Sequence, residues 1–128
     1  MDHLDTERFR AFLLKLQEEI CATLESLEPS TVFQCDQWDR KKGGSGVSKV
    51  IADGDVFEKA GVNFSHVFGK SMPPSATVQR PELAGKAFEA MGVSLVIHPR
   101  NPFVPTSHAN FRLFVAHAEE EKRTWWFG

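Results

Sequence analysis

The hydrophobic residues in the first quarter of the chain recur at helical spacing. They fall three or four residues apart, with Glu and Lys filling the opposite side, at Phe9, Leu13, Leu16, Ile20, Leu24 and Leu27. This period gathers the apolar side chains into one stripe along a helix. Because proline cannot continue a helix, Pro29 marks its end. The pattern therefore predicts an amphipathic helix over about residues 5–27.

From about residue 31 the pattern changes to short β-rich segments separated by glycines and charged turns. These segments are residues 32–35, 46–51, 54–59 and 61–68. Turn sequences such as Asp53-Gly54 favour hairpins, so we expect an antiparallel meander. A loop is expected at residues 73–75 and a second short helix at about residues 81–91, with Pro81 in its first turn, before strands resume at Val93. Without internal repeats, the pattern predicts one α+β unit over residues 1–128.

Composition indicates a globular chain without a global electrostatic field. The 128 residues carry 15 Lys and Arg against 17 Asp and Glu, a net charge of −2, which argues against a nucleic-acid partner. Cys21 and Cys35 form no C-x-x-C pair and are too few for a disulfide framework. No apolar run is long enough for a transmembrane segment, and the N-terminus lacks the apolar core of a signal peptide. We therefore expect a cytoplasmic protein.

The last residues form a dense apolar cluster at Trp125, Trp126 and Phe127. Chain ends are usually exposed, whereas aromatic side chains favour burial. The cluster predicts that these residues form the N-terminal portion of a single longer domain.

Polar side chains alternate along the two segments that flank a loop with prolines at positions 99, 102 and 105. In a strand, alternate residues share a face, which groups Ser94 with His98 and, in the second segment, His108 with Asn110 and Arg112. If the loop joins the two strands as neighbours, all five side chains converge on one face. The prolines would stiffen that loop.

Such a set suits a ligand that carries carboxylates. The planar guanidinium of Arg112 matches a carboxylate, Ser94 and Asn110 can orient a polar ligand, and histidine can move a proton near neutral pH. A solvated sheet face with alternating polar residues is the alternative. His98 and His108 are a weak metal signal by themselves, because zinc sites need three or four ligands. A basic turn at residues 40–46 could hold an anion or be an ordinary hairpin turn, and it lacks the ending of a P-loop.

Several longer motifs resemble those of a known protein family. They are DQWDR with the following GGSG (36–40 and 43–46), FEKAGVNFS (57–65), GVSLVIHPRNP (92–102), PTSHANFR (105–112) and WWFG (125–128). In order and spacing the chain, from about Phe33 to its last residue, resembles the oxygen-dependent coproporphyrinogen III oxidases. The resemblance implies an α+β fold, a large antiparallel β-sheet flanked by α-helices, in a protein that works as a homodimer.

The resemblance also implies an activity and a set of site residues. The family converts two propionates of coproporphyrinogen III to vinyl groups in heme biosynthesis, giving protoporphyrinogen IX, carbon dioxide and hydrogen peroxide. Molecular oxygen is the co-substrate and no organic cofactor is used. Position by position, His108 matches the proton donor and Ser94 a substrate contact, while Asn110, Phe111 and Arg112 match the substrate-binding triplet. In bacterial members His98 and His108 match proposed ligands of a divalent metal.

Two other functions stay open at this point. A truncated chain could be a non-catalytic tetrapyrrole-binding or interaction module. A metal-dependent enzyme that uses His98 and His108 is the second alternative.

Overall fold

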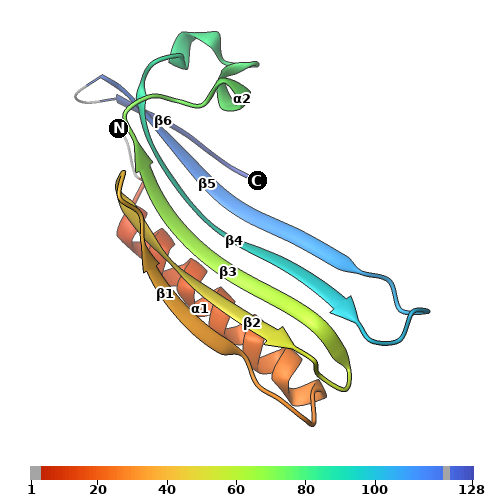
Figure 1. Cartoon of the computed structure of the whole chain (residues 1–128). Coiled ribbons are helices and arrows are strands. Elements are labelled where there is room, and N and C mark those ends of the chain that lie inside the picture. The colour runs from red at the N-terminus through yellow and green to blue at the C-terminus, as the bar shows by residue number, and fades with distance from the viewer. Residues whose placement is uncertain (1–3, 120–121) are drawn as a thin grey trace.

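The computed structural model describes residues 4–119 and 122–128, which form one α+β unit. Its strands make a six-stranded antiparallel sheet in sequence order, β1-β2-β3-β4-β5-β6, as the predicted meander requires. A long helix lies along one face of this sheet and a short helix stands at one end (Figure 1). The elements are α1 (Thr6–Leu27), β1 (Gln34–Asp39), β2 (Gly44–Ala52), β3 (Phe57–Gly69), α2 (Pro74–Thr77), the 3-10 turn η1 (Pro81–Leu83), β4 (Ala87–Pro99), β5 (Ser107–Glu119) and β6 (Lys122–Phe127).

Helix α1 confirms the predicted amphipathic helix almost to the residue. Asp5 caps its start, because the Asp5 carboxylate accepts a hydrogen bond of 3.0 Å from the Arg8 N–H. Leu13, Gln17 and Cys21 are buried on the side that faces the sheet. The Gln17 Nε2 donates to the backbone oxygens of Val47 and Val62. These two bonds attach the middle of the helix to β2 and β3.

The core lies between α1 and one face of the sheet. Alternate residues of β3, β4 and β5 point towards the helix and are buried there: Val62, Phe64, Met91, Val93, Leu113 and Val115. No long helix among the described elements covers the opposite face, which we call the open face. At one end of the open face, α2 and η1 pack over a smaller cluster formed by Met72, Leu83 and Ala116.

Glu28, just after α1, ties the helix to the β2–β3 turn. Its carboxylate accepts hydrogen bonds from the N–H groups of Ser30, Asp55, Val56 and Phe57, and from the Ser30 hydroxyl. Burial raises the pKa of this carboxyl, but the bonds from Phe57, Ser30 and Val56 outweigh it and lower the pKa to about 2. Glu28 is therefore held as an anion.

The start of α1 reaches the last strand. The rings of Phe9 and Phe127 are 5.3 Å apart between centroids, in an edge-to-face arrangement. Arg123 Nη2 donates a hydrogen bond of 2.8 Å to the Leu4 backbone oxygen. The first and last described elements thus contact each other. None of the described helices is long and apolar enough to span a bilayer.

Four sequence-based boundaries are wrong. The second helix expected at residues 81–91 is a single 3-10 turn followed by β4, which begins at Ala87 instead of Val93. The separate strands expected at residues 54–59 and 61–68 are one strand, β3, which runs through Gly61. The first strand begins at Gln34 and continues to Asp39, beyond the expected end at residue 35. In the expected loop at residues 73–75, Pro74 begins the short helix α2.

Candidate functional site

The β4–β5 hairpin places the polar residues of the sequence pattern on the open face. In the register of this strand pair, Ser94 lies opposite Asn110 and Gly92 lies opposite Arg112. His108 lies opposite Val96, two residues further along the hairpin. Directly opposed side chains on one face are about 5 Å apart at Cβ, so Ser94 and Asn110 are within contact range. The parity argument therefore describes this hairpin correctly.

His98 shares this face but stands near the loop end of the hairpin. It is exposed, and its Nδ1 lies 3.4 Å from the Thr106 hydroxyl. By register it is a diagonal neighbour of His108, and residues in this relation are about 7–8 Å apart. The described residues contain no group of three or more His, Cys, Asp or Glu that could hold a metal ion. Within the described chain the two histidines therefore do not complete a metal site.

Phe111 is the one predicted site residue that the structure separates from the others. It lies opposite Val93, on the face that α1 covers, because neighbours in a strand point to opposite sides. Its side chain is 37% exposed. A ligand on the open face would meet Asn110 and Arg112 but not the Phe111 ring.

Arg112 is also held through its backbone. Its N–H donates a hydrogen bond of 2.7 Å to the Gly128 oxygen, and the Gly128 N–H donates one of 3.0 Å in return. Arg112 therefore sits between β4 and the end of β6. The side chain is exposed at this position and extends from a paired backbone.

Strands β1 to β3 supply open-face residues that the sequence analysis missed. One row across the sheet continues from Ser94 to Asn63, Ser48 and Asp36. The next row continues from Gly92 to Ser65, Gly46 and Trp38. The alternation of Asn63 and Ser65 with buried residues signals their face, but only the register aligns them with β4.

The two rows form a surface of mostly small side chains, which we call the floor of the open face. Trp38 lies at its β1 edge. Its Nε1 donates a hydrogen bond of 3.2 Å to the Ser48 hydroxyl. The ring lies over Gly46, where a Cβ atom would overlap it and would also come within 2.8 Å of the Phe64 backbone oxygen. Gly46 is therefore required for the Trp38 ring to lie flat on the sheet.

An aromatic stack forms the other wall of the open face. The Phe88 and Phe114 rings are 5.4 Å apart between centroids, and the Phe114 and Trp126 rings are 5.2 Å apart. The Arg80 guanidinium lies 4.6 Å from the centre of the Trp126 ring. Beside the stack is a hollow of about 230 Å³, lined by Asn110, Arg112, Phe114, Trp126 and Gly128. A cation, an amide and two aromatic rings thus meet in one depression.

Among the described histidines, the buried one, His66, lies elsewhere. His66 Nε2 is 2.7 Å from Glu89 Oε1, and both residues are buried on the face that α1 covers. His117 Nε2 lies 3.8 Å from the other Glu89 oxygen. This group is separated from the open face by the sheet itself.

The amino-acid sequence of the chain was compared with known protein families. Residues 8–128 match the family described as Coproporphyrinogen III oxidase. The chain belongs to the coproporphyrinogen III oxidase family. The matched range contains every strand of the sheet and the whole β4–β5 hairpin, and it confirms the resemblance inferred from the motifs. The chain is therefore assigned to a family of oxidases of porphyrin biosynthesis.

Proposed function

We propose that this chain binds coproporphyrinogen III on the open face and takes part in its oxygen-dependent conversion to protoporphyrinogen IX. The observation that carries the proposal is the β4–β5 register, which sets Arg112, Asn110 and Ser94 side by side on one face. The substrate is an apolar ring system that carries carboxylates. It requires apolar walls and a cation, and the 230 Å³ hollow on the open face is lined by the Arg112 guanidinium and the rings of Phe114 and Trp126.

Each residue has a distinct part in this proposal. The Arg112 guanidinium holds a propionate carboxylate through paired hydrogen bonds, while Asn110 and Ser94 orient polar groups of the ligand. Trp38 and the stack at Phe114 limit where the ring can lie. His108 donates or accepts a proton near the reacting side chain.

The chemistry balances without an organic cofactor. One propionate, one O₂ and one proton give one vinyl group, one CO₂ and one H₂O₂. The carbon–carbon bond to the carboxylate breaks and the β-carbon loses a hydrogen, while the two electrons released reduce O₂. Because the porphyrinogen supplies these electrons, the protein has to orient the propionate and supply or remove protons. Two such turnovers complete the reaction.

Turnover by the natural protein tests the proposal. We expect coproporphyrinogen III to be consumed only when O₂ is present, with CO₂ and H₂O₂ formed in equal amounts. His108→Ala should lower kcat by about 10²–10⁴-fold with little change in melting temperature. His98→Ala is the matched control, since it removes an imidazole from the same face further towards the loop.

Each alternative function has its own signature in this assay. Binding of the porphyrinogen without turnover would favour a non-catalytic binding module. Loss of turnover with a chelator, together with an equal loss in His98→Ala, would favour a metal-dependent enzyme. Normal turnover in His108→Ala would reject the proton role. The expected homodimer is tested on the same preparation by sedimentation.

A further inference from the structure

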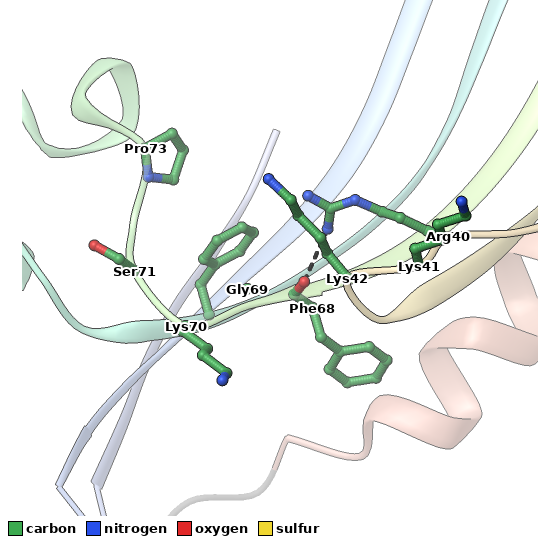
Figure 2. A pocket seen from close by; sticks show the side chains of 9 residues that line it. Arg40, Lys41, Lys42, Phe68, Gly69, Lys70, Ser71 and Pro73 are labelled. Carbon is green, nitrogen blue, oxygen red and sulfur yellow. Dashed lines mark hydrogen bonds between the residues drawn. The ribbon is translucent and has the colours of Figure 1, made fainter.

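A second hollow, of about 600 Å³, lies at the end of the open face where the β1–β2 turn approaches β3 (Figure 2). Its lining includes four basic and two aromatic side chains: Arg40, Lys41, Lys42, Lys70, Phe68 and Phe88. In Figure 2, Arg40 and Lys42 extend from the turn on the side of Pro73, whereas Lys41 and Lys70 extend away from them. Arg40 and Lys42 therefore reach into the same region.

The turn that carries these cations is fixed against β3. Arg40 Nη1 donates a hydrogen bond of 2.8 Å to the Phe68 backbone oxygen, and the Phe68 N–H donates one of 3.2 Å to the Gly43 oxygen. Gly44 has a φ of 112°, and a Cβ there would lie 2.6 Å from the Val67 Cα. Only glycine allows this close approach. The Arg40 guanidinium is therefore held in place without any ligand.

The charge of this hollow is opposite to that of the whole chain. No Asp or Glu lines it, although the net charge of the chain is −2. Arg40, Lys41, Lys42 and Lys70 form no ion pair with any Asp or Glu in the part of the chain that the structure describes. A cluster of unneutralised cations beside aromatic rings favours an anionic group attached to an apolar body.

The same open face joins this hollow to Arg112. Phe88 lines the hollow and stacks on Phe114, which lines the hollow around Arg112. Arg112 is two strands away from β3, in line with Ser65, and Gly69 lies four residues further along β3. At about 4.8 Å per strand and 3.3 Å per residue, the Arg112 and Gly69 backbones are about 16 Å apart. A tetrapyrrole ring with carboxylates on opposite edges can lie between the two hollows.

We propose that the turn formed by Arg40, Lys41 and Lys42 is a second carboxylate site for the same ligand. Arg112 holds one carboxylate of the tetrapyrrole and this turn holds another on the opposite edge of the ring, with the stack at Phe88 and Phe114 against the ring itself. Two anchors fix the rotation of the ring in its plane, and that rotation selects the propionate that is presented for reaction. The inference rests on the proposed function.

Binding of coproporphyrin III, the stable oxidised tetracarboxylate, tests the inference. The variant combines Lys41→Gln with Lys42→Gln, which leaves Arg40 and its hydrogen bond to β3 in place. The control combines Lys15→Gln with Lys122→Gln and removes the same charge from two exposed positions away from the hollow. Fluorescence titration gives Kd at two salt concentrations, and melting temperatures verify that both variants are folded.

We expect the turn variant to bind coproporphyrin III about tenfold more weakly, and the control to match the wild type. The salt dependence of Kd should also be smaller in the turn variant. If the wild type binds and the turn variant binds equally well, the second anchor is wrong while the proposed function stands. If the wild type does not bind, the proposed function fails and the inference fails with it.

Inorganic phosphate separates the two possible sources of the anion. One outcome is that phosphate binds the wild type but not the turn variant, while both bind coproporphyrin III with the same Kd. This result would mark an independent anion site and overturn the inference. Competition between phosphate and coproporphyrin III that disappears in the turn variant would support it.

Discussion

Two glycines on the open face provide a matched test of how the floor is built. At Gly46 a Cβ atom would overlap the Trp38 ring and lie 2.8 Å from the Phe64 backbone oxygen. At Gly61 the nearest atom to a Cβ would be the Asn63 Nδ2, 3.7 Å away. Neither glycine has a positive φ. Gly46→Ala and Gly61→Ala are therefore the same chemical change, but only position 61 has space for the added methyl group.

The expected magnitudes follow from these contacts. In Gly46→Ala the Trp38 ring must move and lose its hydrogen bond to Ser48, worth about 0.5–1.5 kcal/mol. The contact with the Phe64 oxygen forces the paired backbones apart, and overpacking of this kind costs about 1–3 kcal/mol. Together they lower the free energy of unfolding by about 2–4 kcal/mol. Gly61→Ala should instead raise it by about 0.5–1 kcal/mol, because alanine restricts the unfolded chain and no contact opposes it.

Denaturant unfolding of the purified protein measures both changes. Tryptophan fluorescence serves as the probe, and its native emission should shift only in Gly46→Ala, since only that change moves Trp38. Equal midpoints for Gly46→Ala and Gly61→Ala, with unchanged native emission, would refute the close packing of Trp38 on Gly46.

Three further outcomes are expected. Arg112→Lys keeps the charge but loses the paired hydrogen bonds, so kcat/KM for coproporphyrinogen III should fall by about 5–150-fold, which corresponds to about 1–3 kcal/mol. Unchanged kinetics in both Arg112→Lys and Arg112→Ala would remove Arg112 from the site. The folded pKa of Glu28, about 2, lies below its ordinary 4.5, so its contribution to stability is complete above pH 4.5 and is lost as the pH falls towards 2. Glu28→Gln should therefore lower the melting temperature at pH 7 and differ progressively less from the wild type in that window; a constant difference would contradict this. Burial raises the pKa of the Cys21 thiol to about 11, whereas Cys35 is exposed. A thiol reagent at about pH 8 should therefore modify Cys35 alone until denaturant is added. Rapid modification of two thiols per chain in the native protein would contradict this expectation.

Periodicity predicted the parts of the structure that depend on one segment alone. The stripe from Phe9 to Leu27 gave the bounds of α1, because a helical period, a capping Asp5 and a following Pro29 all act locally. Alternation likewise predicted that His108, Asn110 and Arg112 share a face, since side-chain direction in a strand follows from parity.

The failures occurred where tertiary contacts override local preference. Residues 86–91 are rich in helix formers, yet pairing with β3 and β5 makes Ala87–Met91 part of a strand. The sequence pattern predicts a break between strands at Gly61, but pairing with Val50 and Val96 carries β3 through it. Trp38 and Asn63 were missed as open-face residues near Ser94, because the register between strands is a property of the pairing and not of any single segment.

The contact between Phe9 and Phe127 has a consequence for the order of folding. Each strand pairs with its neighbour in sequence, so the sheet can form by successive local hairpins, which is the fast kind of contact. The start of α1 packs on the core of β3, β4 and β5, but its contact between Phe9 and Phe127 spans nearly the whole chain and forms only when β6 is in place. Folding of the first turn of α1 is therefore expected to be the closing step, and protection of its amides in pulsed hydrogen exchange should appear after that of the β4–β5 hairpin.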